Sequence, residues 1–548
     1  MRPSRFRGWG SGVWIVSVLA TALVLRLAWQ GRESGLASDS CQYLSIARAV
    51  AQGHGFDSGG SQHPDLSRPP VYPVALAFIA FLVPNAETAA WLFAALASAL
   101  SIWPLTILAR DFFGVRAGIL AAVLGTFSCL VAAGARFLPT APFLVLCLGA
   151  AALVWRGVRS DRTNVVFIAG TLCGLAALTR MEGILWAPAF GMWVLVASPG
   201  RLGRRLVLTV WLLAGAAMVY VPYAGWASTR LGRPVLSPGL EYLRLTRVVA
   251  DSLGLRELPG SSLDWAYNAR VALTADHRDL VLNAAFRDGV LPESDRESTN
   301  PETARAAAEG ESVLWISARR IVIVLQNLRE LPYAIRATHF APIPIVLLAA
   351  AGVVRSLITR RQRSRLLFLA VLTALTLVPV ASHIEARFLY ELFAVQVLFA
   401  ADGWAWIDRC ARLPYLRPLS RVAVTTIVLA VGLGHPLGGD PRPERIAFLR
   451  TEAARVQLPK GAMMAVQPQF PFIAGRRYRA IPLGTPEDVL EYGLANGATT
   501  LVFEGDRDLE RRPALSALLT DALPNGFRLL HSEPYPDGGE LRVFAIGR

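Results

Sequence analysis

Long apolar segments, each about 15–24 residues and separated by short arginine-rich breaks, run through the chain as far as residue 436. A transmembrane helix needs roughly 20 apolar residues to cross the hydrocarbon core of a bilayer. Of the 548 residues, 53% are hydrophobic and only 17% are charged. This composition excludes a disordered chain, a collagen-like fibre and an ordinary soluble enzyme. The pattern therefore predicts a polytopic membrane protein that is mainly α-helical.

Eleven segments are predicted to cross the membrane. They are 11–29, 86–109, 117–135, 138–156, 163–179, 183–198, 205–224, 338–356, 366–381, 388–407 and 420–436. Basic residues precede the first segment, as in a signal peptide, but that segment is long and no small-residue cleavage site directly follows it. We therefore interpret 11–29 as an uncleaved membrane helix.

Arginine is distributed unevenly between the segments. With the N-terminus placed in the cytoplasm, 20 arginines fall in short inner loops and three, Arg136, Arg180 and Arg387, fall in short outer loops. Such an excess is typical of cytoplasmic loops. If 71–84 also crossed the membrane, every later loop would lie on the opposite side and the arginine excess would no longer fall inside. We therefore interpret that short, proline-containing segment as an interfacial or re-entrant helix on the outer face. The C-terminus is then also outside.

Two domains follow from this arrangement. Residues 1–436 form the membrane domain, with outer loops 30–85 and 225–337, and residues 437–548 form a small periplasmic α/β domain. In the second loop, 275–290 and 301–311 are expected to be helical, and 312–330 is expected to be an amphipathic helix at the interface.

The C-terminal domain alternates strand and helix patterns, which predicts a small mixed sheet. The strands are expected at 462–466, 499–504, 527–531 and 541–546, and the helices at 485–496 and 515–523. The first helix has Thr485 as its cap, a proline in its first turn and Gly497 at its end.

The net charge of +15 does not indicate a nucleic-acid partner. Lys460 is the only lysine, and the arginines cluster in the gaps between apolar segments, as in cytoplasmic loops. The five cysteines form no CxxC motif, which disfavours a disulfide framework or a zinc site. The chain also lacks a P-loop, a dinucleotide-binding GxGxxG, a GxSxG elbow and an HExxH motif, so an ATP-driven pump is not expected.

The first outer loop contains the clearest candidate for catalysis. Asp39 starts a predicted helix, 39–52, that ends at Gly53. Ser38 or Asp39 can simply cap this helix. Alternatively, the Asp39 carboxylate, at the membrane surface, can act as general base toward an acceptor hydroxyl.

Further along the same loop, two histidines and two aspartates are residue types that can ligate a divalent metal ion, although their spacing matches no tight ligand motif. They are His54, Asp57, His63 and Asp65. The alternative is ordinary loop polarity, so a metal is not required by the sequence. Arg68 follows, with lipid-headgroup contact as its simplest role.

Charged residues recur at two other outer positions. Arg180 and Glu182 lie in a tight turn between predicted helices, where they form either a local ion pair or an interface anchor. Arg387 has a similar position. Guanidinium groups suit phosphate, so the outside arginines point to an anionic partner on the outer leaflet.

Four segments together resemble the C-type membrane glycosyltransferases, and most of all the glycosyltransferase family 39 group of aminoarabinose and protein mannosyltransferases. These segments are DSCQYLSIARAVAQGHGF, RPPVYPVALAF, LTRMEGILWAP and EARFLYELFAVQVLFAADG. The resemblance covers about residues 10–435. It implies an inverting transfer from a polyprenyl-phosphate sugar in the periplasm of a bacterium.

The resemblance also implies roles for individual residues. Asp39 would be the base that activates the acceptor, and Arg68 and Arg387 would hold the donor phosphate. Beside these, we take Arg180, Glu182 and Tyr43 as further candidates for substrate contact. Two departures weaken parts of this assignment: Thr140 stands where many members have an acid, and Ser40 stands where a second acid often follows Asp39.

Two other functions are alternatives for a polytopic membrane protein. A transporter or flippase of lipid-linked sugars would need charges near the bilayer midplane and matching halves, and the sequence shows neither a repeated half nor a central acidic residue. A sensor or scaffold would act through the C-terminal domain. The sequence therefore favours a membrane glycosyltransferase whose acceptor is a lipid, a protein or a glycan.

Overall fold

The computed structural model describes most of the chain, and the described residues divide into two compact units. The described residues are 10–29, 36–56, 68–83, 85–127, 137–231, 234–237, 343–359, 363–378, 390–410, 443–481, 485–509, 513–536 and 538–547. The division falls within two helices, between Ala89 and Ala90 and between Pro222 and Tyr223.

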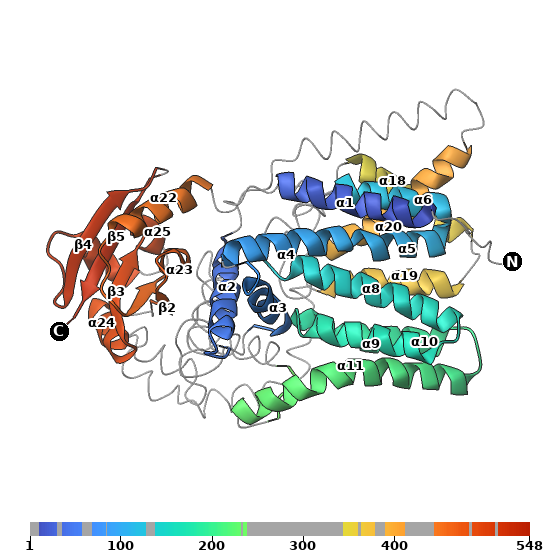
Figure 1. Cartoon of the computed structure of the whole chain (residues 1–548), viewed down its shortest axis with the longest axis horizontal. Coiled ribbons are helices and arrows are strands. Elements are labelled where there is room, and N and C mark those ends of the chain that lie inside the picture. Colours follow the sequence, from blue (N-terminus) through green and yellow to red (C-terminus); the bar gives the residue numbers. More distant parts are fainter. Residues whose placement is uncertain are drawn as a thin grey trace. The chain divides into compact units, whose positions relative to one another are not determined.

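The first unit is a bundle of long apolar helices (Figure 1). The helices that contribute to it are α1 (Gly10–Trp29), α4 (Ala86–Leu100), α5 (Ile102–Phe113), α6 (Val115–Phe127), α8 (Thr140–Arg159), α9 (Thr163–Ala177), α10 (Trp186–Ala197), α11 (Leu202–Leu231), α18 (Ile343–Ile358), α19 (Arg363–Thr376) and α20 (Tyr390–Cys410). Helix α5 packs on α6, α8 on α9, α10 on α19 and α18 on α20.

The helices agree with the predicted membrane segments. Ten of the eleven segments fall on described helices, and segment 420–436 lies outside the described residues. Among the described residues, three stretches are long and apolar enough to cross a membrane: Ala86–Phe113, Thr140–Arg159 and Leu202–Thr229. The mainly helical fold is therefore confirmed, and the number of crossings stays a prediction.

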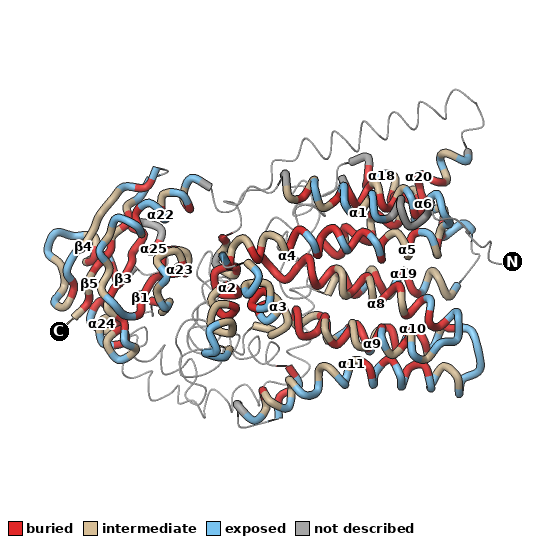
Figure 2. Tube along the Cα trace, in the orientation of Figure 1, coloured by how far each residue is buried: buried red, intermediate tan, exposed pale blue. Residues whose placement is uncertain are grey.

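An aromatic cluster fills the centre of the bundle, where Figure 2 shows the buried faces of the helices. Phe368 stacks on Phe190, with ring centroids 5.4 Å apart, and meets Trp193 edge-on at 4.7 Å. Phe112 meets Trp155 edge-on at 4.6 Å. Aromatic rings bury large apolar areas, so this contact set holds α5, α8, α10 and α19 together.

Helices α18 and α20 approach each other at two glycines. A Cβ atom on Gly403 would lie 1.9 Å from the Leu348 carbonyl oxygen, and one on Gly352 would lie 2.0 Å from the Phe399 carbonyl oxygen. Because no side chain fits in that space, both positions require glycine. Small residues at such contacts are typical of helix packing in membranes.

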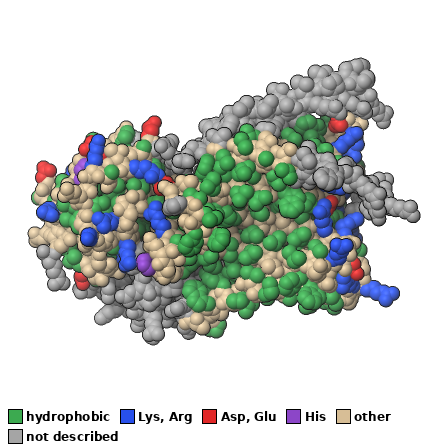
Figure 3. Space-filling model, viewed as in Figure 1, with side chains coloured by type: hydrophobic (Ala, Val, Ile, Leu, Met, Phe, Trp, Pro, Cys, Tyr) green, Lys and Arg blue, Asp and Glu red, His purple; other side chains and the backbone are tan. Residues whose placement is uncertain are grey.

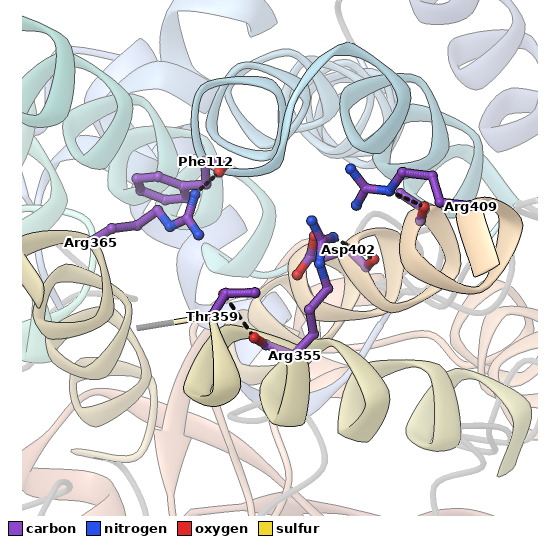
Figure 4. Close-up of polar contacts among 7 residues, drawn as sticks. Phe112, Arg355, Thr359, Arg365, Asp402 and Arg409 are labelled. Atoms are coloured by element: carbon purple, nitrogen blue, oxygen red, sulfur yellow. Dashed lines mark hydrogen bonds and ion pairs between the residues drawn. The ribbon is translucent and has the colours of Figure 1, made fainter. Parts of the chain in front are cut away.

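Charged side chains gather at one end of the bundle, where α8 ends and α9 begins (Figure 3). Arg156 binds Asp111 at 2.5 Å. Arg355 of α18 pairs with Asp402 of α20, and Arg365 donates to the Phe112 carbonyl oxygen (Figure 4). These arginines belong to the loops or helix ends that the sequence places on the inner side.

The second unit contains two short helices and the C-terminal α/β domain. Its elements are α2 (Ser38–Ala51), α3 (Val71–Ala80), α22 (Pro443–Arg455), β1 (Ala462–Ala465), α23 (Gln469–Ile473), β2 (Arg477–Ala480), α24 (Pro486–Ala495), β3 (Ala498–Phe503), α25 (Gly505–Leu509), the 3-10 helix η5 (Pro513–Leu519), β4 (Phe527–Pro534) and β5 (Glu540–Ile546). The first residues of α4 and the end of α11 also belong to it.

The predicted mixed sheet is present, with strand order β2-β1-β3-β5-β4. Strand β1 pairs in parallel with β2 and β3, and β5 pairs antiparallel with β3 and β4. Thr485 and Asp488 form a capping box at the start of α24, as the predicted cap requires. Strand β2 was not predicted, and in place of the helix expected at 515–523 the structure has the 3-10 helix η5. The helices predicted at 275–290, 301–311 and 312–330 lie outside the described residues. Helix α11 continues to Leu231, past the predicted end of its segment at residue 224.

Candidate functional site

Helices α2 and α3 pack together and position the first group of candidate residues. Helix α2 begins at Ser38, and its N-cap residue is Ala37, which makes no side-chain capping bond. Asp39 therefore lies in the first turn, where a carboxylate interacts favourably with the helix dipole. The rings of Tyr43 on α2 and Tyr72 on α3 meet edge-on, 5.1 Å apart, and fix the two helices against each other.

Arg68, just before α3, reaches back to the first turns of α2. Its guanidinium forms an ion pair with Asp39 and donates a 2.9 Å hydrogen bond from Nη2 to Gln42 Oε1. The same guanidinium lies 5.0 Å from the centroid of the Tyr43 ring. The side chains of Arg68 and Asp39 are 19% and 21% exposed, so the pair is accessible from outside.

The structure thus brings together three predicted residues, Asp39, Tyr43 and Arg68, and adds two that the sequence analysis missed. Gln42 is three residues after Asp39 and therefore shares its helix face. Tyr72 is buried, and burial, with a smaller contribution from Tyr43, raises the pKa of its phenol well above the ordinary value. Its hydroxyl consequently stays neutral at physiological pH.

The second group lies in the first unit, in the turn between α9 and α10. The backbone N–H groups of Thr179 and Arg180 both donate to the Ala176 carbonyl oxygen and end α9. The 3-10 helix η1 (Met181–Leu185) follows. A Cβ atom on Gly183 would lie 2.4 Å from the Ala176 carbonyl carbon, so only glycine allows this turn to close on the helix.

Arg180 lies between two carboxylates. Its Nη2 atom is 3.1 Å from Glu182 Oε1, and its Nη1 atom is 3.3 Å from Glu391 Oε1. The guanidinium also lies 5.2 Å from the centroid of the Phe143 ring. The local ion pair, one of the two arrangements expected for this turn, is therefore present, and Glu391 from the first turn of α20 joins it. The three formal charges sum to −1.

The remaining sequence candidates are only partly described. Arg387, Asp57, His63 and Asp65 lie outside the described residues, and His54 is exposed. Thr140, which stands in place of a family acid, is the buried first residue of α8.

A family model described as dolichyl-phosphate-mannose-protein mannosyltransferase matches residues 67–226. That range contains Arg68, Arg180 and Glu182 and begins after Asp39. No curated protein sequence matches the chain.

Solved structures of membrane glycosyltransferases share the fold. The Archaeoglobus fulgidus oligosaccharyltransferase AglB, in complex with an inhibitory peptide and a dolichol-phosphate, is 13% identical, with 98% of this chain and 74% of that chain covered and a TM-score of 0.55. The same enzyme in complex with zinc and sulfate is 13% identical, with 96% and 72% covered and a TM-score of 0.58.

ArnT from Cupriavidus metallidurans, bound to undecaprenyl phosphate, is 16% identical, with 97% and 98% covered and a TM-score of 0.48. The resemblance found in the sequence is confirmed by the family match. The family match covers residues 67–226, and the AglB structures show that the chain has the fold of a membrane oligosaccharyltransferase.

Proposed function

We propose that the protein is an inverting glycosyltransferase of the bacterial inner membrane. It moves a sugar from a polyprenyl-phosphate donor to a lipid, protein or glycan acceptor on the periplasmic side. The matched family is named after a sugar carried on such a lipid phosphate, and AglB holds dolichol-phosphate. The excess of arginine in the predicted inner loops supports the orientation, with the N-terminus in the cytoplasm and the C-terminus in the periplasm.

The proposed reaction is a single displacement. The acceptor hydroxyl attacks the anomeric carbon while the bond from that carbon to the donor phosphate oxygen breaks. Asp39 takes the hydroxyl proton as general base. The polyprenyl phosphate leaves with the electrons of the broken bond, and fixed cations stabilise its developing charge.

The ion pair between Arg68 and Asp39 is the observation that carries this proposal. A guanidinium holds a carboxylate in a defined orientation, and a base must be aimed at the proton that it removes. Gln42 and the Tyr43 ring in turn orient Arg68. A guanidinium has five N–H donors, so Arg68 can orient Asp39 and also contact the donor phosphate.

Arg180 and Arg387 are proposed to contact the same phosphate. Glu182 and Glu391 hold the Arg180 guanidinium in place, and a phosphate would bind it in competition with one of the carboxylates. Tyr43 is proposed to contact the sugar or lipid through its ring.

A donor screen tests the proposed activity. The purified full chain in lipid nanodiscs is incubated with undecaprenyl phosphate carrying radiolabelled mannose or aminoarabinose, with a bacterial envelope extract as acceptor. We expect the label to move from the lipid to the acceptor fraction. Folded protein that transfers neither sugar, yet moves the labelled lipids across vesicle bilayers, would overturn the transferase and support the flippase.

Asp39→Asn tests the mechanism, with Asp111→Asn as its matched control. Both aspartate side chains are 21% exposed and both pair with an arginine, but Asp111 lies at the charged end of the bundle. Loss of a general base lowers the rate about 10²–10⁴-fold. We expect that loss for Asp39→Asn and a nearly unchanged rate for Asp111→Asn. Equal rates for the two variants would remove Asp39 from the mechanism.

A further inference from the structure

Three metal-ligating side chains from two elements of the C-terminal domain meet at one point. They are Glu452 of α22 and His531 and Glu533 of β4, and their ligand atoms all lie within 4.8 Å of one another. The glycosyltransferase reaction uses none of them.

The register of β4 puts both strand residues on the same face of the sheet. His531 and Glu533 are two residues apart, and side chains at that spacing point to the same side of a strand. They pair with Val543 and Leu541 of β5, which are both fully buried. A register shift between Leu529 and His531 sets this alternation, and such bulges re-aim side chains.

Glu452 occupies a position where helix periodicity calls for an apolar residue. Ile446, Leu449 and Glu452 follow one another at intervals of three, and the first two are 1% exposed. The Glu452 side chain is 2% exposed. A buried carboxylate is costly unless it is paired or coordinates a metal, so this position needs a cation.

The observed partners of Glu452 supply only part of that positive charge. Its Oε2 atom is 2.8 Å from His531 Nε2. Its Oε1 atom is 3.0 Å from Arg455 Nη1, but the Arg455 side chain is 63% exposed. A second carboxylate, Glu533, adds another negative charge to the same cluster.

We propose that Glu452, His531 and Glu533 bind one divalent transition-metal ion, of which Zn²⁺ is the best fit. Imidazole nitrogen and carboxylate oxygen are ordinary zinc ligands, at about 2.0–2.2 Å. Tetrahedral bonds of that length put neighbouring ligand atoms about 3.3 Å apart, so the Glu452–His531 contact opens by a few tenths of an ångström. The ion neutralises both carboxylates and ties α22 to the edge of the sheet.

Metal titration of the full chain tests this site. Protein purified in nanodiscs and stripped with a chelator is titrated with Zn²⁺ by calorimetry, and Co²⁺ is used as a spectroscopic substitute. We expect one ion per chain and a higher thermal midpoint for the C-terminal domain. His531→Ala and Glu533→Gln should each lower the affinity at least tenfold. Both residues are partly exposed, so these variants remain informative even if replacing Glu452 prevents folding.

Glu487→Gln is the matched control, because Glu487 is an exposed glutamate of the C-terminal domain outside the cluster. It should bind Zn²⁺ like the parent protein. Absence of binding at micromolar Zn²⁺, or unchanged affinity in His531→Ala, would overturn the proposal. The measurement does not involve sugar transfer, so its result is independent of the proposed activity.

Discussion

Arg180 and Glu391 form a buried ion pair although 211 residues separate them in the sequence. Their side chains are 8% and 5% exposed. The pair ties the turn between α9 and α10 to the first turn of α20, so it joins two segments of the family resemblance. Among the described residues, Glu391 Oε2 has no hydrogen-bond partner.

Arg180→Ala should destabilise the protein more than Glu391→Gln does. The first change leaves two carboxylates close together with no cation between them, and breaking a buried pair in this way costs about 3–5 kcal/mol. The second change leaves Arg180 paired with Glu182. Thermal unfolding in nanodiscs measures both variants.

Arg156→Ala is the control for this comparison. It breaks an ion pair in the same bundle whose arginine side chain is 43% exposed. Exposed ion pairs contribute about 0–1 kcal/mol to the free energy of unfolding. The thermal midpoint of Arg156→Ala should therefore stay close to that of the parent protein. A smaller loss for Arg180→Ala than for Glu391→Gln would contradict the central place of Arg180.

Arg68→Lys should lower the transfer rate although it keeps the positive charge. A lysine ammonium lacks the planar fork that holds Asp39 and Gln42 together, so the base loses its orientation. We expect a loss of about tenfold or more for Lys and a larger one for Ala, seen in kcat rather than in KM. Arg156→Lys should retain the rate, and an active Arg68→Ala would rule out the orienting role.

The sequence predicted the fold in outline because membrane helices and helix caps are local signals. Apolar length located ten of the segments that the structure shows as helices, and Thr485 marked the start of α24. Strand β2 was not predicted because its sequence, RYRA, carries two arginines. The strand lies at the edge of the sheet, where side chains need not be apolar.

The sequence predicted individual residues of the candidate site but not the contacts between them. Composition and spacing marked Asp39, Arg68, Arg180 and Glu182. The partners that hold them depend on packing between separate helices, as with Tyr72 on α3 and Glu391 on α20. Glu391 lies inside EARFLYELF, part of one of the segments that resemble the family. The sequence therefore offered a signal for Glu391 itself but none for its contact with Arg180.

Glu540 should make the C-terminal domain sensitive to acid. A hydrogen bond from Ser532 and then the contacts with Arg542 hold the pKa of the Glu540 carboxyl below its ordinary value. A lowered folded pKa stabilises the fold above the unfolded value of 4.5 and stops doing so as pH falls through the folded value.

Thermal unfolding from pH 6 to pH 3 checks this prediction. The midpoint of the parent should fall more steeply below about pH 4.5 than that of Glu540→Gln, which lacks the titrating group. Identical slopes would show that other carboxyls account for the acid sensitivity. Glu487→Gln, which changes an exposed glutamate of α24, serves as control and should follow the parent.

Arg48→Ala should loosen the C-terminal domain from α2. The Arg48 guanidinium lies 3.9 Å from the centroid of the Phe472 ring on α23, and its Nη1 atom donates to the Phe472 carbonyl oxygen at 3.4 Å. A partly buried cation–π contact contributes about 1 kcal/mol, or about fivefold in the population of the detached state. Limited proteolysis should therefore release the C-terminal domain several-fold faster.

Arg528→Ala changes an exposed arginine on β4 and should be cleaved like the parent. Because α2 also carries Asp39, a loosened domain can disturb the candidate base. Arg48→Ala should then slow sugar transfer in proportion to the faster cleavage, while Asp39→Asn slows transfer and leaves cleavage unchanged. Rapid cleavage with full transfer would show that α2 keeps its position without this contact.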